Sequence, residues 1–172
     1  MSKLPVISGV KVVRALSKIG YEVFGVDASQ SGVEIAKRQY GPSVKFVCSE
    51  IAPALLEKLG KENFDLVVSI DVIEHLYRPS ELIQTARGLL RRGGYFLLTT
   101  PYHGYFKYLA LSLTGQMDRH LNPLYDGGHI KFFSVQTLSC LISEYGFRKS
   151  RFEFFGRLPW LWKSTICLAR KI

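Results

Sequence analysis

Segments that alternate between strand-like and helix-like patterns constrain the fold of this chain more than any other feature. Short apolar runs, typical of strands, occupy residues 21–26, 44–48, 64–70 and 95–100, and helix-like segments occupy 10–19, 29–40, 54–59 and 81–90. This alternation over short connections predicts an α/β fold, in which a mostly parallel sheet has helices on both faces. Two further apolar runs, at 147–155 and 162–170, predict a C-terminal antiparallel strand pair. We therefore expect a sheet that binds its ligand beyond the carboxyl ends of its strands.

Polar residues stand where these strands end, which is where such a ligand would lie. Asp27, Ser49, Glu50, Asp71 and Thr100 directly follow predicted strands. A carboxylate at the position of Asp27 can accept hydrogen bonds from both ribose hydroxyls of a nucleoside cofactor. The alternative for Asp27 is structural, because an aspartate before a serine-rich segment commonly caps a helix. The sequence alone leaves both roles open.

A second polar group, formed by Asp71, Glu74 and His75, crowds the end of the strand predicted at 64–70. Three polar side chains in five residues are costly there unless they face a cavity. An imidazole exchanges protons near neutral pH, so His75 is a candidate base for a substrate hydroxyl. Carboxylates beside an imidazole can also hold a divalent ion, which is the less favoured hypothesis, and we assign no metal ligand. A hydrogen-bonded turn before the next helix is the remaining alternative.

The size and composition of the chain indicate one globular domain. With 172 residues, 47% of them apolar, the chain can bury a sizeable core. Its net charge of +9 comes from scattered basic residues without a nucleic-acid-binding motif, so we expect no nucleic-acid partner. Peripheral contact with an anionic membrane and assembly into a homo-oligomer stay open. Three distant cysteines and the lack of a signal-peptide or membrane-span pattern favour the cytoplasm.

The segment 102–128 interrupts the alternation of strands and helices. It contains a helix-like stretch at 105–113 and a polar part rich in Asn, Pro, Asp and Gly. Insertions of this length inside a compact domain commonly form a lid or a binding segment. We therefore expect a cap over the substrate, whose tyrosines would cover an acceptor or pack within the cap itself.

Four motifs in order give the pattern a more specific likeness. They are 20–29 (GYEVFGVDAS), 64–75 (FDLVVSIDVIEH), 90–101 (LRRGGYFLLTTP) and 128–134 (GHIKFFS). Together they resemble the Rossmann-like, class I methyltransferases that use S-adenosylmethionine, particularly the branch of ubiquinone-biosynthesis O-methyltransferases. The resemblance implies S-adenosylmethionine as the cofactor, methyl transfer to oxygen as the activity and a small-molecule methyl acceptor.

The resemblance also implies roles for individual residues. Those implied for the cofactor lie at or near strand ends, namely Asp27, Ala28, Glu50, Ile51, Ser69 and Asp71. The first would bind the ribose, the next three would surround the adenosine, and the last two would pass near the methionine part. His75 would be the catalytic base, and His129 would approach the substrate. The carboxylate-x-x-Glu-His spacing of Asp71, Glu74 and His75 also matches a pattern by which some relatives bind a metal.

The N-terminal part departs from the family pattern, in which a strand that ends in an acidic residue leads into a Gly-x-Gly-x-Gly loop. Residues 4–10 contain one glycine, Gly9, and no acidic residue precedes Glu22. Leu4 to Ile7 could form a stub strand, but Pro5 disfavours a central one because it cannot donate a ladder hydrogen bond. We therefore expect the N-terminal strand and its loop to be truncated or replaced.

This departure leaves two functions open. One is an active methyltransferase, and the other is a truncated or degenerate relative without catalysis. An NAD-dependent oxidoreductase is disfavoured, because it needs a G-x-G-x-x-G loop that the chain lacks.

Overall fold

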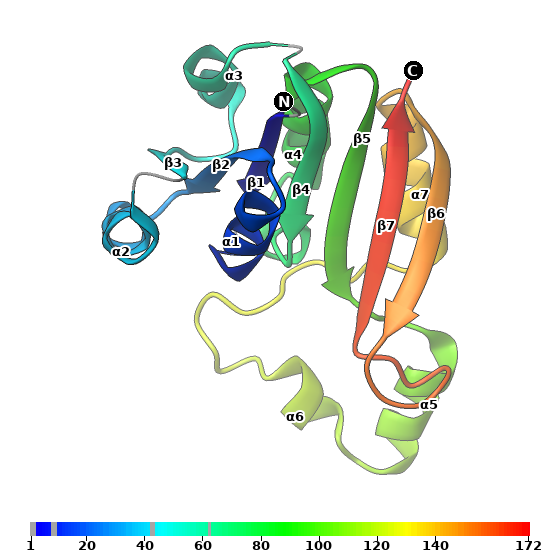
Figure 1. Ribbon diagram of the computed structural model, residues 1–172. Coiled ribbons are helices and arrows are strands. Elements are labelled where there is room, and N and C mark those ends of the chain that lie inside the picture. The colour runs from blue at the N-terminus through cyan, green and yellow to red at the C-terminus, as the bar shows by residue number, and fades with distance from the viewer. Residues whose placement is uncertain (1–2, 8–9, 42–43, 62) are drawn as a thin grey trace.

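A computed structural model of the chain describes residues 3–7, 10–41, 44–61 and 63–172, and its centre is a seven-stranded sheet (Figure 1). The strands are β1 (Lys3–Ile7), β2 (Glu22–Asp27), β3 (Lys45–Cys48), β4 (Phe64–Ile70), β5 (Leu90–Pro101), β6 (Phe147–Phe155) and β7 (Ser164–Lys171). Their order in the sheet is β3-β2-β1-β4-β5-β7-β6. The first five pair in parallel, and β7 pairs antiparallel with both β5 and β6. The predicted fold class is confirmed, with the antiparallel pair at the sheet edge.

Helices cover both faces of this sheet. The helical elements of the described residues, of which α5 and α6 lie away from the sheet faces, are α1 (Val10–Lys18), α2 (Gln30–Tyr40), α3 (Pro53–Leu59), the 3₁₀ turn η2 (Ile73–His75), α4 (Pro79–Leu89), α5 (Tyr105–Leu113), α6 (Met117–Leu121) and α7 (Val135–Glu144). Figure 1 shows α1 in front of the sheet and α4 and α7 behind it. Consecutive strand residues point to opposite faces, so Val67 and Val68 of β4 join two separate hydrophobic clusters. This two-sided burial explains why the sequence of β4 is almost continuously apolar.

The N-terminal strand corrects one expectation from the sequence. β1 lies in the middle of the parallel part, between β2 and β4, although it contains Pro5. Its described pairs with β2 extend from Lys3 to Ile7, whereas those with β4 begin only at Val6. Pro5 therefore lies where β1 is paired on one side, much as in an edge strand, where a missing N–H is tolerated. The predicted replacement of the glycine-rich loop falls on Ser8 and Gly9, which lie outside the described residues.

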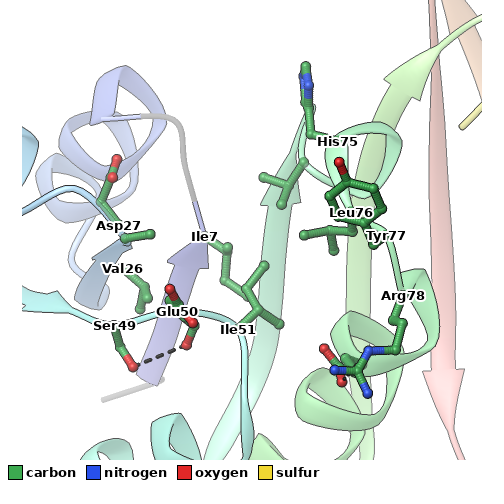
Figure 2. Close-up of a pocket in the computed structure, with 13 residues that line it drawn as sticks. Ile7, Val26, Asp27, Ser49, Glu50, Ile51, His75, Leu76, Tyr77 and Arg78 are labelled. Carbon is green, nitrogen blue, oxygen red and sulfur yellow. Dashed lines mark hydrogen bonds and ion pairs between the residues drawn. The ribbon is translucent and has the colours of Figure 1, made fainter. Parts of the chain in front are cut away.

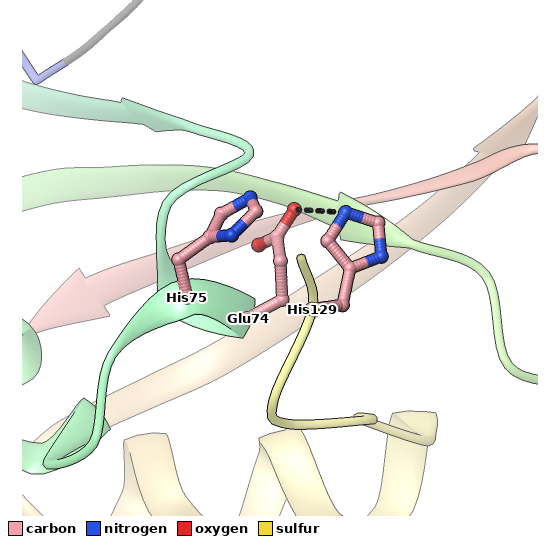
Figure 3. Close-up of side chains that lie close together, drawn as sticks. All are labelled: Glu74, His75 and His129. Atoms are coloured by element: carbon pink, nitrogen blue, oxygen red, sulfur yellow. Dashed lines mark ion pairs between the residues drawn. The ribbon is translucent and has the colours of Figure 1, made fainter. Parts of the chain in front are cut away.

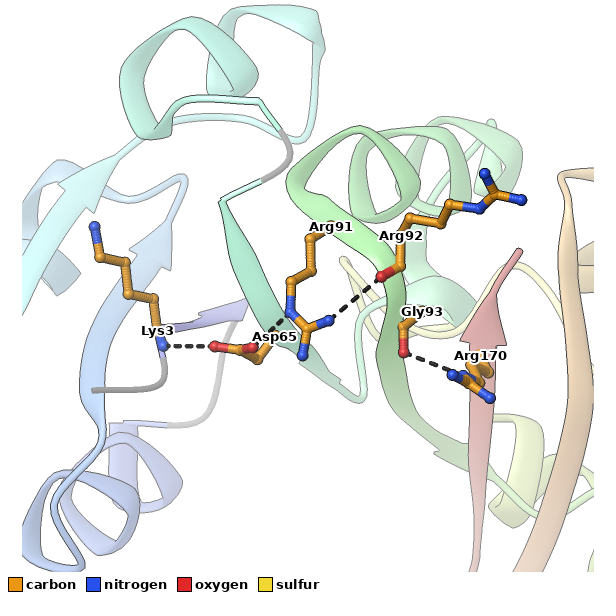
Figure 4. Close-up of polar contacts among 6 residues, drawn as sticks. All are labelled: Lys3, Asp65, Arg91, Arg92, Gly93 and Arg170. Carbon is orange, nitrogen blue, oxygen red and sulfur yellow. Dashed lines mark hydrogen bonds and ion pairs between the residues drawn. The ribbon is translucent and has the colours of Figure 1, made fainter.

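A polar contact near the amino-terminal ends of the parallel strands holds β1 in place (Figure 4). The carboxylate of Asp65 on β4 accepts one hydrogen bond from the backbone N–H of Lys3, at 3.2 Å, and another from Nε of Arg91, at 2.7 Å. The Arg91 hydrogen bond is the main reason why the pKa of Asp65 lies below its ordinary value. One side chain thus connects β1, β4 and β5.

The start of β5 also differs from the sequence prediction. The pattern places a strand at 95–100, but β5 begins at Leu90, directly after α4. Pairing with β4 shifts from Phe64–Leu90 to Leu66–Tyr95, so four residues of β5 form an irregular excursion. Gly93 adopts a φ of +77° within it, a conformation that favours glycine. The two glycines at 93 and 94 therefore mark a bulge within a strand rather than the end of a helix.

The inserted segment lies beyond the carboxyl ends of β4 and β5, where Figure 1 shows α5 and α6. The helix predicted at 105–113 is confirmed as α5, and α6 within the polar part was not predicted. The backbone N–H of Tyr102 donates to the carbonyl of Lys163, which joins the insertion to the connection between β6 and β7. Within the described part of the chain, none of the helices has the length and apolar character that crossing a membrane requires.

Candidate functional site

A cavity of about 540 Å³ opens at the carboxyl ends of the parallel strands (Figure 2). Its lining comes from the ends of β1 and β2, the segment after β3, and the stretch from η2 to the start of α4. These residues are Ile7, Val26, Asp27, Ala28, Ser49, Glu50, Ile51, Val72, His75, Leu76, Tyr77, Arg78 and Glu81. Mostly apolar walls with a few convergent polar groups are typical of small-molecule sites, and this volume lies within their usual range.

Asp27 lies at the end of β2, and its carboxylate lines this cavity. Its Oδ1 accepts a hydrogen bond from the backbone N–H of Ser29 at 2.8 Å. The N-cap of α2 is Ser29 itself, whose side chain accepts from the N–H of Gly32. The capping role that the sequence left open for Asp27 therefore belongs to Ser29, which Asp27 supports. Among the described contacts none occupies Oδ2, so that oxygen is available to a ligand.

Five of the residues that the sequence predicted for the site line this cavity together. They are Asp27, Ala28, Glu50, Ile51 and His75. The parallel register explains their meeting, because Asp27 of β2 pairs with Cys48 of β3 and brings the segment after β3 beside it. The backbone N–H of Ser49 donates to the carbonyl of Asp27, which ties the segment after β3 to the end of β2.

Ser69, Asp71 and His129 were also predicted, and the structure places them outside the lining of this cavity. Ser69 is fully buried on β4, and its hydroxyl oxygen has no hydrogen-bond partner among the described residues. Asp71 is exposed and has a positive φ of 48°, uncommon for a residue other than glycine. Its Oδ1 accepts a hydrogen bond from Thr99 Oγ1 at 2.8 Å, which ties it to β5.

Glu74, His75 and His129 gather beside this cavity (Figure 3). One ligand atom from each lies within 4.8 Å of the others, a spacing that could hold a metal ion. Asp71 is not part of this group, so the structure replaces one member of the pattern seen in the sequence with His129. Backbone hydrogen bonds hold the segment that carries His129 beside Glu74, because the N–H groups of Ile130 and Lys131 both donate to the carbonyl of Glu74.

Glu74 is a fully buried carboxyl group. Its Oε2 accepts from Thr100 Oγ1 at 3.2 Å, whereas Oε1 has no hydrogen-bond partner within the described part of the chain and lies 4.0 Å from Nε2 of His129. Burial, and next to it the charge of Asp71, raises the pKa of Glu74 to about 7. A buried carboxylate oxygen without a partner is costly, which favours the protonated form of this group or a bound cation.

The contact of His75 with Gly128 assigns its tautomer. Nδ1 of His75 lies 3.2 Å from the carbonyl oxygen of Gly128. A carbonyl oxygen only accepts, so in this contact Nδ1 carries the proton and Nε2 keeps a free lone pair. His75 packs edge-to-face on His129, with ring centroids 4.9 Å apart. The geometry thus presents a proton-accepting nitrogen at the edge of the cavity.

Sequence reasoning missed a further histidine in the inserted segment. His103 is 9% exposed, and its Nδ1 lies 2.6 Å from the hydroxyl of Tyr108. Burial, together with Lys107 and two other histidines, lowers the pKa of His103 to about 4. Its Nε2 is buried without a partner among the described residues. The only sequence signal was its position two residues after a strand end, because its partners His120 and Phe132 come from distant segments.

The arrangement of strands, cavity and polar group can be compared with known proteins. The family described as methyltransferase domain matches residues 8–150, which is most of the chain. The chain belongs to the class I S-adenosylmethionine-dependent methyltransferases.

Two relatives of this methyltransferase are ubiquinone biosynthesis O-methyltransferases. The protein from Coxiella burnetii is 30% identical over 128 residues, which cover 73% of this chain and 53% of that protein. The protein from Ruegeria sp. is 25% identical over 154 residues, which cover 88% of this chain and 61% of that protein. The chain therefore spans little more than half the length of these relatives.

Solved structures share the fold of this methyltransferase. A SAM-dependent methyltransferase from Archaeoglobus fulgidus superposes with a TM-score of 0.74 at 17% identity, covering 99% of this chain and 86% of that one. Magnesium protoporphyrin IX methyltransferase from Synechocystis PCC 6803, solved with bound SAH, gives a TM-score of 0.73 at 20% identity, covering 100% and 74%. These comparisons give no support to the alternative of a non-catalytic relative.

Proposed function

We propose that this methyltransferase binds S-adenosylmethionine in the 540 Å³ cavity and methylates an oxygen atom of a small metabolite. The observation that carries the proposal is the meeting of Asp27, Ala28, Glu50 and Ile51 around one cavity at the ends of adjacent parallel strands. Ligands of doubly wound sheets bind at this edge. The relatives named above, at 25–30% identity, support oxygen as the methyl acceptor.

The residues present fit the cofactor. Oδ2 of Asp27, which takes part in none of the contacts among the described residues, would accept hydrogen bonds from the ribose hydroxyls, and Ala28 leaves room for the adenosine. Glu50 and the apolar side chain of Ile51 would flank the adenine. Ser69 and Asp71, at the end of β4, would lie nearest the methionine part. When bound, S-adenosylmethionine supplies an electrophilic methyl group on a sulfonium.

His75 would remove the proton of the acceptor hydroxyl. Its Nε2 is the free acceptor nitrogen, and the carbonyl of Gly128 holds the ring through Nδ1. Nε2 would take the hydroxyl proton of the acceptor, while the sulfonium would supply the methyl group to the acceptor oxygen and its sulfur would keep the electron pair of the broken carbon–sulfur bond. His129 packs against the ring of His75 and would hold the acceptor on that side. Segment 102–128, which lies beyond the same strand ends, would cover the acceptor as a cap.

The acceptor atom can be tested with paired compounds. Small phenols and sugars would be offered alongside analogues that carry an amino group in place of the hydroxyl, with S-adenosylmethionine labelled in the methyl group. The proposal predicts label in the hydroxyl compounds alone. Label confined to the amines would contradict oxygen as the acceptor. No label in any compound, despite saturable cofactor binding, would contradict the proposed methyl transfer to such acceptors.

A divalent ion at Glu74, His75 and His129 is a second candidate, favoured by the buried Oε1 of Glu74 that lacks a partner. One carboxylate and two imidazoles suit Zn²⁺, Mn²⁺ or Fe²⁺. The two candidates exclude each other at His75, because a nitrogen that binds a metal cannot take a proton.

A chelator separates these candidates. Transfer that survives removal of metal by EDTA supports His75 as the base. Transfer that is lost, and restored by Mn²⁺ or Zn²⁺ in the wild type but not in Glu74→Gln, supports the metal.

A further inference from the structure

We propose that a second pocket, between α5 and the connection 156–163 of β6 and β7, binds a single-chain amphiphile with an anionic head group. This α5 pocket has a volume of about 440 Å³. Its apolar walls are Ala110, Leu111, Leu158 and Leu161, and its two charged residues are Lys107 and Arg157. It shares no lining residue with the cavity at the strand ends, so it stands independently of the proposed methyl transfer.

The two charged residues of the α5 pocket have no counterion among the residues that the structure describes. Lys107 is only 6% exposed, and its Nζ donates one hydrogen bond, of 2.8 Å, to the carbonyl oxygen of Tyr102. An ammonium group has three donors, so this contact leaves it incompletely satisfied. None of the ion pairs among the described residues involves Lys107 or Arg157. A buried cation without an anionic partner is costly, which an anionic ligand would relieve.

Arg157 adds a second positive charge to that of Lys107. Its charge, after burial itself, lowers the pKa of Lys107, which places the two cations within electrostatic reach of each other. Like charges that face one pocket repel, and a phosphate or carboxylate between them would turn this repulsion into attraction. The α5 pocket thus combines two cations for a head group with aliphatic side chains for an alkyl chain.

The loop that carries Arg157 has an unusual backbone. Arg157 and Trp160 have φ values of 65° and 62°, in the left-handed region that residues other than glycine seldom adopt. Hydrogen bonds from the backbone N–H of Leu161 to Leu158 and of Lys163 to Phe155 hold the loop in this form. Such strained positions persist where the surrounding structure fixes them, and they concentrate at ligand sites. The loop contributes Arg157, Leu158 and Leu161 to the lining of the α5 pocket.

The same loop supplies a reporter for binding. The chain has two tryptophans, Trp160 and Trp162, and both belong to this loop. Trp160 is 59% exposed and lies 6.4 Å from the ring of Phe106 on α5. A ligand in the α5 pocket would change the environment of Trp160, so tryptophan fluorescence follows its occupancy.

The test is a fluorescence titration of the full chain with dodecyl phosphate below its micelle concentration. Arms with dodecyl maltoside and with inorganic phosphate separate the contributions of chain and head group. We expect saturable binding of dodecyl phosphate and at least tenfold weaker binding of the other two. Arg157→Gln, which breaks no described hydrogen bond, should weaken binding at least tenfold, and Lys107→Met should do the same if circular dichroism shows it folded. Arg119→Gln, the same charge change on α6 outside the pocket, should leave the affinity unchanged.

Three results would overturn the proposal. Equal affinity for the maltoside would show that the cations do not select the ligand, and equal affinity for inorganic phosphate would show that the apolar walls do not. Binding to phosphatidylglycerol vesicles without any binding of monomeric dodecyl phosphate would assign these residues to a membrane surface instead of a pocket. Unchanged affinity of the folded Arg157→Gln variant would also reject the site.

Discussion

The two sides of the proposed active site are built in different ways. On the cofactor side, residues such as Asp27 and Glu50 sit at the ends of neighbouring strands, and sheet register brings them together. On the acceptor side, Glu74 and His103 are buried ionisable groups, held by contacts between distant segments. The first design suits a ligand that a whole family shares. The second suits a substrate that differs from one family member to the next, because buried polar groups select for a matching partner.

The largest effect that tests this division is expected at His75. His75→Gln removes the nitrogen that would take the acceptor proton, and general bases contribute about 10²–10⁴-fold to rate. We expect methyl transfer to fall by at least a hundredfold, while the affinity for S-adenosylhomocysteine changes less than twofold. Transfer rates come from the label assay, and affinities come from calorimetry. A parallel loss of cofactor affinity would break the comparison, because His75 would then belong to the cofactor side.

The next effect is a pH dependence that originates on the acceptor side. Burial lowers the pKa of His103 to about 4, whereas the unfolded chain keeps the ordinary value of about 6.5. Below pH 6.5 the unfolded state takes up a proton that the folded state resists, so this stability is present above about pH 6.5 and is lost as the pH falls toward 4. The difference between these values corresponds to about 3 kcal/mol.

Urea unfolding at pH 7 and pH 4.5 measures this effect. Between pH 7 and pH 4.5, the free energy of unfolding should fall by about 2–3 kcal/mol less in His103→Phe than in the wild type, since Phe does not titrate. His75→Gln is the control, because His75 is exposed, and it should keep the wild-type dependence. An identical loss in His103→Phe would show that His103 is already solvated in the folded protein.

The smallest effect is expected at Asp65, whose contacts hold β1 beside β4. Asp65→Asn weakens the contacts with Lys3 and Arg91, one of them an ion pair whose carboxylate is 34% exposed. Partly exposed pairs contribute about 1 kcal/mol or less, so we expect a loss of that size in the free energy of unfolding. Cofactor affinity should stay within twofold, because Asp65 lies at the end of the strands away from the cavity. A loss above about 3 kcal/mol would mean that β1 depends on this contact for its place in the sheet.

The same contrast decides what could be predicted from the sequence. The strand that ends at Asp27 and the helix that follows Ser29 rest on local patterns and capping, so both were predicted. Pro5 misled the prediction because its tolerance depends on which neighbour pairs with β1, and β4 pairs only from Val6 onward. The start of β5 was predicted five residues too late, because the bulge around Gly93 interrupts the apolar pattern of the strand.

Less of the acceptor side could be predicted from the sequence. His129 was predicted from a resemblance, but its place beside Glu74 follows from backbone hydrogen bonds between residues 74 and 130–131, which no local pattern contains. His103 was missed because its burial depends on Tyr108, His120 and Phe132 together. Local periodicity therefore predicts strand ends, whereas the environment of a buried side chain needs the tertiary structure.

Calorimetric titration with S-adenosylhomocysteine tests the central claim, that the cavity at the strand ends is the cofactor site, most directly. Asp27→Asn still accepts the hydrogen bond from Ser29 but removes the charge offered to a ribose, and Asp118→Asn is the same change on exposed α6. Hydrogen bonds to charged groups contribute about 1.5–3 kcal/mol, so the account predicts saturable binding that Asp27→Asn weakens at least tenfold and Asp118→Asn leaves within twofold. A folded wild-type protein that binds no S-adenosylhomocysteine, or an Asp27→Asn variant that binds it equally well, would contradict the account.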